Sequence, residues 1–314
     1  MSTPSSPILV TGATGRHGGL GGLLVRRLRE AGREVRVLAR KKDERTEPLV
    51  ALGADVVVGD LQDRASLLHA LDGVDLVYFA YPINQGVIPA AANFAAAVRQ
   101  VGRSPRVVVM SMGPAVPDSP SHLGRAQWLA EEVLAWAGLD LLVLRVAALF
   151  HENLAVLHAR SVRERGVFRN SFDETVLPWI AGVDAAELAV AALLHPERFS
   201  GAALEILPGS EAASHAEVAR VLSAELGREV CFEGISAQAW REELEAQAAS
   251  ETDGVVNADM ASHISALGAA LRGASTVPVD PDRLTHLTGH TPRTLAEYIS
   301  EQRDLFGPAI GASR

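Results

Sequence analysis

The first half of this 314-residue sequence alternates short apolar segments with stretches of helical periodicity. The apolar segments are rich in Val, Ile and Leu without polar alternation, which is typical of strands covered by helices on both faces. Strands that alternate with helices form parallel sheets, because each crossover returns the chain to the same edge. We therefore predict an α/β fold with an open, doubly wound parallel sheet of the Rossmann type. The predicted strands are residues 8–11, 34–39, 55–58, 75–80, 106–111 and 141–146.

The pattern changes after about residue 150. We predict strands at 202–207 and 229–233, a helix at 214–226 opened by a capping box of Ser214 and Glu217, and a helix at 237–249. Residues 251–275, rich in Ala, Gly and Ser, are interpreted as a mobile lid or a helical cap. The expected division is a domain of residues 1–150 and a smaller α/β portion of residues 151–314, with about 175–195 packing back on the first domain.

A glycine-rich segment, VTGATGRHG, lies between the first predicted strand and a predicted helix at 20–31. Gly12, Gly15 and Gly18 have the spacing that a bound pyrophosphate requires: a tight turn, close backbone approach and helical N–H groups aimed at the anion. The alternative is a glycine-rich turn without a ligand. Other third glycines, which would shift the helix start by a turn, are Gly19, Gly21 and Gly22. The predicted phosphate-binding residues are Gly12, Thr14, Gly15, Arg16, His17 and Gly18.

The end of the second predicted strand indicates which dinucleotide binds. An acid there would bind the ribose 2′-hydroxyl of NAD(H), whereas an Arg accommodates the 2′-phosphate of NADP(H). This strand ends in Arg40, Lys41 and Lys42, and no acid occurs before Asp43. We therefore predict NADP(H), bound by Arg40 and Lys41. The alternative is a solvated basic loop neutralised by Asp43 and Glu44.

These segments resemble the NmrA-like family of atypical short-chain dehydrogenases. The matching segments are TGATGRHG at 11–18, VRVLARK at 35–41, GADVVVGDLQDRASLLHALDGVDLVYF at 53–79, RVVVMS at 106–111, AGLDLLVLR at 137–145, FHEN at 150–153, PWIAGVDAAELAVAALLHPE at 178–197 and TGHTPRTLAEYI at 288–299. The resemblance implies an NAD(P)-binding fold in which Asp60 and Leu61 approach the adenine and Ala80 lines the site. The chain departs from the family between Gly18 and Gly32, where it is longer by about three residues, close to one helical turn.

The usual Tyr-x-x-x-Lys pair of short-chain dehydrogenases is missing. The three tyrosines are Tyr78, Tyr81 and Tyr298, and the residues four positions later are Pro82, Gln85 and Gln302. Relatives place a lysine or a histidine four residues before the glutamate of an E-x-x-L-x-x-x-G segment, and the resemblance assigns that glutamate to Glu131 and that position to Gln127. A glutamine can hold a ribose hydroxyl but does not transfer a proton at neutral pH.

Catalytic candidates come from loops at the carboxyl ends of the predicted strands, where ligands bind. Tyr81 follows the fourth strand and is the leading proton donor, Ser111 ends the fifth and is a candidate oxyanion ligand, and His122 and His151 lie in the loops after the fifth and sixth. The alternatives are packing for Tyr81, a strand-end cap for Ser111, solvation for His122 and a structural role for His151.

Substrate contacts are expected from Phe150, Asn153 and Trp179. The family match suggests a loop-shaping hydrogen bond for Asn153. Phe168, Phe172 and Trp179 could also wall an apolar pocket, although such aromatic residues more commonly belong to the core.

Two functions compete. One is an NADPH-dependent oxidoreductase that reduces a small aromatic or conjugated molecule, such as a quinone, imine, azo or enone compound, with bacterial secondary metabolism as one setting. The other is a non-catalytic regulatory protein that senses NADP(H).

A formal charge of −9 argues against a nucleic-acid partner, and no apolar segment approaches the length of a membrane span. We expect a cytoplasmic protein without a metal site, since zinc spacing is missing, and leave a homodimer open.

Overall fold

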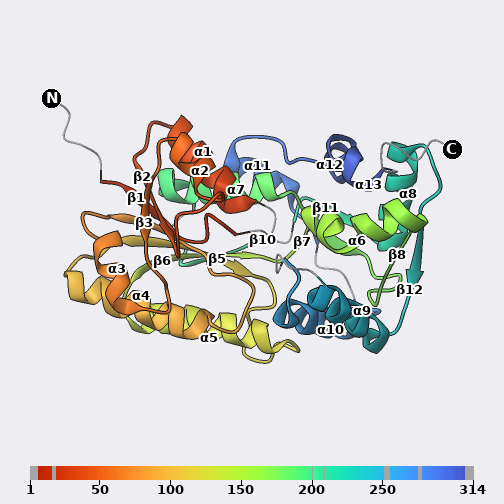
Figure 1. Ribbon diagram of the computed structural model, residues 1–314. Helices are drawn as coiled ribbons and strands as arrows, with labels where there is room; N and C mark the ends of the chain where they lie inside the picture. The colour runs from red at the N-terminus through yellow and green to blue at the C-terminus, as the bar shows by residue number, and fades with distance from the viewer. Residues whose placement is uncertain are drawn as a thin grey trace. The chain divides into compact units, whose positions relative to one another are not determined.

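The computed structural model describes residues 6–15, 19–199, 201–207, 209–250, 255–274 and 278–307. It divides into two compact units. Unit 1 comprises Met1–Val146, Ala185–Leu207 and His286–Gly289, and unit 2 comprises Ala147–Asp184, Pro208–Thr285 and His290–Arg314. Figure 1 shows the elements of both units. The expected roles of the two portions, cofactor binding and substrate binding, stay predictions.

Unit 1 is built on a seven-stranded sheet in the order β10-β6-β5-β4-β1-β2-β3, with every neighbouring pair parallel. Its strands are β1 (Ile8–Val10), β2 (Val35–Ala39), β3 (Asp55–Val58), β4 (Leu76–Phe79), β5 (Arg106–Met112), β6 (Asp140–Val146) and β10 (Leu204–Leu207). The strand order reverses between β1 and β4, which is the switch point where doubly wound sheets bind ligands. The predicted fold class is confirmed.

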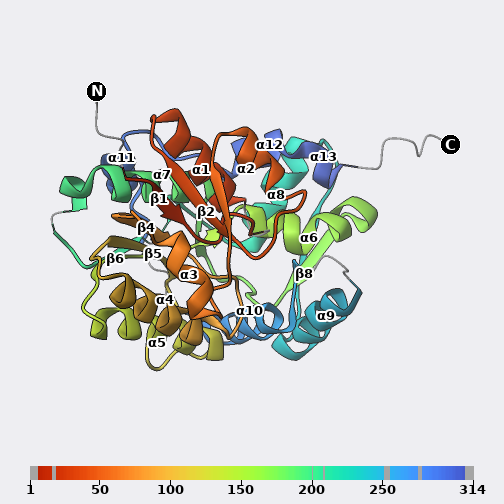
Figure 2. The same cartoon turned by 60° about the vertical axis from the view of Figure 1, so that its left-hand side comes forward.

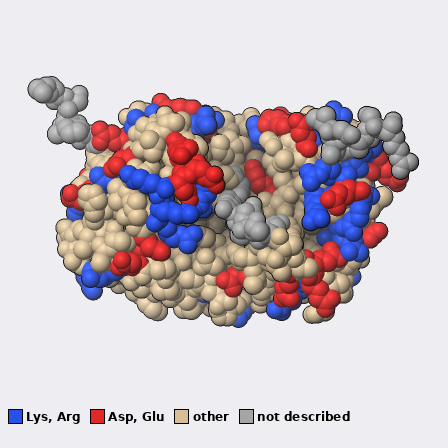
Figure 3. All heavy atoms as spheres, in the orientation of Figure 1, with Lys and Arg blue, Asp and Glu red and all other residues tan. Residues whose placement is uncertain are grey.

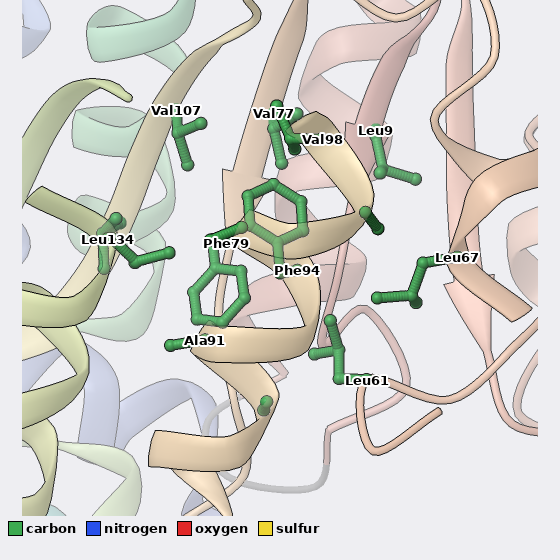
Figure 4. Close-up of a cluster of buried hydrophobic side chains, with 14 of the residues drawn as sticks. Leu9, Leu61, Leu67, Val77, Phe79, Ala91, Phe94, Val98, Val107 and Leu134 are labelled. Carbon is green, nitrogen blue, oxygen red and sulfur yellow. The ribbon is translucent and has the colours of Figure 1, made fainter. Parts of the chain in front are cut away.

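Helices cover both faces of this sheet, as Figures 1 and 2 show. One face carries α1 (Leu20–Glu30), α2 (Glu47–Ala51) and α7 (Gly182–Leu194), and the other carries α3 (Arg64–Ala70), α4 (Val87–Val101) and α5 (His122–Trp136). The core under the second face is drawn in Figure 4, where the rings of Phe79 on β4 and Phe94 on α4 lie 5.2 Å apart. This apolar layer fixes α4 and α5 against the sheet and so fixes the loops at its carboxyl edge.

The sequence predicts the end of α1 correctly, but it does not predict which sheet β10 joins. The predicted end of α1 is confirmed, because Gly32 follows the helix with φ +73°, a left-handed conformation that glycine adopts readily. The predicted strand at 202–207 exists as β10. The sequence places it among the elements after residue 150, whereas it pairs with β6 in the sheet of unit 1.

Unit 2 contains two small sheets. In one, β9 (Leu177–Ile180) pairs with β7 (Leu149–Phe150) and β11 (Glu211–Ala213), and in the other β8 (Val167–Asn170) pairs with β12 (Cys231–Gly234). Its helices are α6 (Glu152–Arg165), α8 (His215–Leu226), α9 (Ala237–Ser250), α10 (Ala258–Leu271), α12 (Leu295–Glu301) and α13 (Arg303–Phe306). The helix α11 (Pro281–Thr288) is divided between the two units, and a 3₁₀ turn at Pro196–Phe199 belongs to unit 1.

Two sequence predictions for unit 2 can be compared with this arrangement. The capping box at the start of α8 is confirmed, with Ser214 and Glu217 bonded reciprocally. Within the interval 251–275, the described part is mostly the regular helix α10, which Asn257 caps by accepting from the Met260 N–H. Among the described helices, none is both long and apolar enough to cross a membrane.

Candidate functional site

The glycine-rich turn follows β1 at the switch point of the sheet. Thr11 joins the ends of β1 and β4, because its hydroxyl donates to the Ala80 carbonyl at 2.8 Å and accepts from the Ala80 N–H at 2.9 Å. Gly12 follows with φ +72°, and its carbonyl accepts from the Gly15 N–H at 3.0 Å. A Cβ on Gly12 would lie 3.1 Å from the Ala80 carbonyl oxygen. The described part of the turn is therefore tight, and Gly12 and Gly15 present no side chain to an approaching phosphate.

The glycine that allows the helix to pack against the turn is Gly21. A Cβ on Gly21 would lie 2.5 Å from Ala13 Cα and 2.8 Å from the Gly12 carbonyl oxygen, so only glycine fits there. This is the function of the third glycine in the dinucleotide fingerprint. α1 begins at Leu20, where the sequence predicts it, and the close approach falls on Gly21, one of the alternative third glycines. The predicted phosphate contacts Arg16, His17 and Gly18 lie outside the described residues.

The basic segment after β2 separates into paired and exposed charges. Asp43 lies 2.7 Å from Arg45 and 3.5 Å from Lys41. The hydrogen bond from Arg45 is the main reason why the pKa of Asp43 falls to about 2. Arg40 is exposed at the carboxyl end of β2. The acid of this segment is thus already matched by two other bases, which leaves Arg40 suited to an external phosphate.

Tyr81 follows β4, and its hydroxyl is directed to the loop after β3. Its hydroxyl accepts a hydrogen bond from Gln62 Nε2 at 2.6 Å, and the same nitrogen donates to the Gly86 carbonyl at 2.8 Å. Burial raises the pKa of Tyr81, while the Gln62 hydrogen bond and the charge of Arg40 oppose this and the charge of Asp60 adds to it. The phenol is therefore neutral and lies within electrostatic reach of the ends of β2 and β3.

The two residues that the resemblance places near the adenine differ in the solvent exposure of their side chains. Asp60 is partly exposed, and its carboxylate accepts from the Gln62 N–H at 2.9 Å. The Leu61 side chain instead belongs to the core cluster drawn in Figure 4. Its carbonyl accepts from Asn93 Nδ2 at 3.0 Å. Of the two, Asp60 has the free surface that a ligand would need.

A buried polar cluster lies at the carboxyl end of β5. Ser111 on β5 and Arg145 on β6 are direct partners across the two strands, and the Ser111 hydroxyl donates to the Glu131 carboxylate from α5. Arg145 donates to the same carboxylate through Nη2 and, at 3.1 Å, through Nε. Gln127, one turn earlier on α5, is also buried. Sequence reasoning used Glu131 only to locate Gln127 and missed that it binds Ser111.

The sequence analysis expects His122 in a loop, but the structure places it in a helix. It is the exposed first residue of α5, because Ser121 caps the helix by accepting from the Gly124 N–H at 3.3 Å. His151 in unit 2 is fully buried directly before α6. Its Nε2 lies 2.9 Å from Glu211 Oε1, and its ring packs 5.6 Å from that of Tyr298. His122 therefore faces solvent, whereas His151 is enclosed within unit 2.

Unit 2 contains a small pocket of about 20 Å³, room for one water molecule. Its lining is mostly apolar and aromatic: Leu149, Asn153, Leu154, Leu157, His158, Phe172, Trp179, His215, Trp240 and Ile264. Asn153 and Trp179 are among the predicted substrate contacts, Phe150 is half-buried on β7 outside this lining, and Phe168 is buried behind it.

Two imidazoles face this pocket. The His215 ring stacks on Phe172 at 5.3 Å, and the His158 ring lies 5.0 Å from Phe168. Burial lowers the pKa of His158 to about 4 and that of His215 to about 3, so both are neutral at physiological pH. Sequence reasoning missed both, since nothing in the local pattern distinguishes a histidine in the first turn of α8. In the part of the chain that the structure describes, no group of three or more metal-ligating side chains gathers.

Comparison with known proteins matches these elements to a family. The model of the NmrA-like family matches residues 4–299. The chain belongs to the NmrA-like family. One similar protein is the NAD(P)H azoreductase of Xenophilus azovorans. It is 31% identical over 307 residues, which are 96% of this chain and 100% of the relative. The (4-alkanoyl-5-oxo-2,5-dihydrofuran-3-yl)methyl phosphate reductase of Streptomyces griseus is 31% identical over 301 residues, 96% of this chain and 99% of the relative.

A solved structure has the same NmrA-like architecture. The NADPH-dependent quinone oxidoreductase of Escherichia coli, complexed with NADPH, matches with a TM-score of 0.75 at 24% identity, over 94% of this chain and 99% of that one. At this identity the likeness supports the fold. The resemblance stated from the sequence is confirmed by the family match.

Proposed function

We propose that this NmrA-like protein is an NADPH-dependent reductase of a small aromatic or conjugated molecule of the quinone, imine, azo or enone type. The observation that carries the proposal is the turn after β1, where Gly12 and Gly21 leave a close backbone approach at the switch point of the sheet. The names of the two relatives at 31% identity, an azoreductase and a reductase of a (dihydrofuranyl)methyl phosphate, support reduction as the reaction class.

The residues of unit 1 fit a phosphorylated dinucleotide. The turn of Gly12, Thr14 and Gly15 would hold the pyrophosphate, and Arg40 with Lys41 would bind the 2′-phosphate. Asp60 lies on the same side of the switch point as Arg40, and the Tyr81 hydroxyl is hydrogen-bonded to Gln62 in the loop after β3, so we assign both to the adenosine half. NADPH, when bound, supplies the hydride, and the chain supplies its position and surroundings.

The substrate portion is proposed for unit 2. Its pocket combines the rings of Phe172, Trp179 and Trp240 with a few polar groups, which is the usual composition of small-molecule sites. Asn153, His158 and His215 would supply the hydrogen bonds that orient a flat, uncharged molecule. Because the pocket holds only one water, a ring must displace lining side chains when it enters.

The contacts of the four catalytic candidates reduce the number of possible proton donors. The single Ser111 proton is donated to Glu131, and His151 is enclosed beside Glu211. Tyr81 keeps its proton, but its phenol is directed to Gln62 in the loop after β3, which we assign to the adenosine half. His122 keeps an exposed imidazole at the start of α5, next to the strand that carries Ser111. We therefore propose His122, or solvent, as the proton source.

The charge distribution supports a small-molecule substrate. Acidic and basic side chains are interspersed over the face drawn in Figure 3, in keeping with a net charge of −9. Strand binding of nucleic acid would instead need a continuous basic surface. A cytoplasmic location and a homodimer stay predictions.

Anaerobic incubation with NADPH and a panel of quinones, azo dyes, imines and enones tests the proposal. We expect the absorbance of NADPH to fall with at least one compound and a reduced product to form in equal amount. Loss of NADPH without a reduced product, or no loss with any compound, would count against it.

A second candidate is an NADP(H) sensor without turnover. It is favoured by one observation, namely that neither tyrosine at the carboxyl edge is followed by a lysine at the fourth position, since Pro82 and Gln85 stand there. A sensor would bind NADPH with full affinity and leave every compound of the panel unreduced.

A further inference from the structure

The buried cluster of Ser111, Glu131 and Arg145 restricts what Ser111 can do. A serine hydroxyl has one proton and two lone pairs, whereas an ionised carboxylate only accepts. Arg145 donates to both Glu131 oxygens through Nε and to Oε2 also through Nη2, so the carboxylate is an acceptor toward Arg145 as well as toward Ser111. The Ser111 proton is therefore committed to Glu131, and its lone pairs are what remains for a ligand.

The cluster is rigid for three independent reasons. Ser111 and Arg145 are register partners on adjacent parallel strands, so their backbones are fixed by the sheet. Glu131 comes from α5, which packs on the same strands through the core cluster that includes Leu134. Ser111 is 7% exposed and Glu131 5%, so water does not compete freely for these hydrogen bonds.

The position of Ser111 determines which half of a dinucleotide it would meet. A doubly wound sheet binds one mononucleotide on each side of its switch point, and Arg40 and Asp60 mark the side of β2 and β3 as the adenosine half. The carboxyl end of β5 lies on the other side of β1 and β4. The nicotinamide half belongs there, and its carboxamide carries an N–H₂ donor.

We propose that Ser111 is a hydrogen-bond acceptor for the carboxamide N–H₂ of the nicotinamide, and that Glu131 and Arg145 are positioning residues that keep it an acceptor. This inference rests on the proposed function. It also changes the role expected from the sequence, because a serine whose proton is donated to Glu131 cannot donate to an oxyanion.

The test compares binding of NADP⁺ with binding of its 3-acetylpyridine analogue, in which a methyl group replaces the amide nitrogen. Isothermal titration should give wild-type protein a preference for NADP⁺ of about three- to tenfold, the contribution of one hydrogen bond. Ser111→Ala should bind both dinucleotides equally, and Ser111→Thr, which keeps a hydroxyl, should restore the preference.

The Glu131→Gln variant tests whether Glu131 positions the Ser111 proton. Its amide nitrogen can donate to Ser111, which frees the serine proton for the acetyl oxygen of the analogue, so the preference for NADP⁺ should disappear or reverse. If this variant does not fold because Arg145 loses its carboxylate, the two Ser111 variants decide. Equal binding by wild-type protein, or an unchanged preference in Ser111→Ala, would overturn the inference alone, whereas binding of neither dinucleotide would overturn the proposed function as well.

Discussion

The carboxyl edge of the sheet in unit 1 and the pocket of unit 2 differ in how their buried polar groups are hydrogen-bonded. At the sheet edge, Thr11, Ser111 and Glu131 are bonded to named partners in a fixed arrangement. In the pocket, His215 lies among aromatic rings, and its Nδ1 has no hydrogen-bond partner among the described residues. An edge of oriented, hydrogen-bonded polar groups suits a ligand with fixed charges, and an uncharged ring cage suits an apolar one.

The largest expected effect is on acid stability in unit 2. Because burial lowers the pKa of His215 to about 3, the unfolded chain takes up this proton near pH 6.5 and the folded chain does not. The free energy of unfolding should therefore fall with decreasing pH below about 6.5, by about 1.4 kcal/mol per pH unit for this group. His158 acts in the same direction, whereas Asp184, whose pKa burial raises to about 6, acts in the opposite one.

Urea unfolding between pH 6.5 and pH 4 isolates the His215 contribution. His215→Phe keeps a ring between Phe172 and Phe232 and should reduce the pH slope by about 1.4 kcal/mol per unit. His69→Gln, on the exposed surface of α3, is the matched control and should leave the slope unchanged. Equal slopes in wild type and His215→Phe would mean that the pocket imidazole is hydrated or paired.

Two neighbouring glycines of α1 test the close approach in unit 1. Gly21→Ala forces its Cβ against Ala13 and should cost about 1–3 kcal/mol of unfolding free energy and weaken NADPH binding. Gly22→Ala meets no atom of the described residues within 4 Å, so it should instead stabilise the helix by up to about 1 kcal/mol. Urea midpoints and calorimetric titration measure both. A neutral Gly21→Ala would show that the helix does not need this approach.

Arg40 tests the discrimination between NADPH and NADH. Wild-type protein should bind NADPH at least about tenfold more tightly, since one guanidinium–phosphate contact is worth about 1.4 kcal/mol or more. Arg40→Ala should remove most of that difference and leave NADH affinity unchanged. Arg26→Ala, an exposed arginine on α1, is the control for loss of one positive charge. Equal affinities of wild-type protein for the two dinucleotides would remove the case for Arg40.

The smallest expected effect concerns Tyr81. If its phenol belongs to the adenosine half, Tyr81→Phe loses one hydrogen-bonding group and should weaken NADPH binding about three- to tenfold, with kcat unchanged. The proton-donor role expected from the sequence instead requires kcat to fall by about 10²-fold or more at unchanged affinity. Steady-state kinetics together with calorimetric titration distinguish the two results.

The inner strands of the sheet in unit 1 could be predicted from the sequence because they are mostly apolar runs with few exposed residues. The segment 106–111 was recognised in this way, and the strand Arg106–Met112 extends it by one residue. The elements between β7 and β9 gave no such signal. Segments such as Val167–Asn170 are short and alternate buried with half-buried residues, so their periodicity is too brief to read.

The candidate site was predictable only where local chain geometry determines it. Glycine spacing and the missing acid after β2 predict Gly12, Gly15 and Arg40 as binding residues without a structure, and these assignments stay predictions. The partners of Ser111 come from residues 20 and 34 positions further along the chain, and no sequence pattern shows that a helix brings Glu131 to it. Likewise, His215 joins the pocket only because α8 packs against the rings of unit 2.

The central claim is that a hydride passes from NADPH to an aromatic or conjugated substrate. The direct measurement is anaerobic turnover with NADPH deuterated at C4, using each of the two diastereomers with the compound that wild-type protein reduces fastest. We predict slower turnover with one diastereomer, deuterium loss from that position of the cofactor, and normal rates with the other. Tight NADPH binding with no turnover of any compound would contradict the claim and establish the sensor instead.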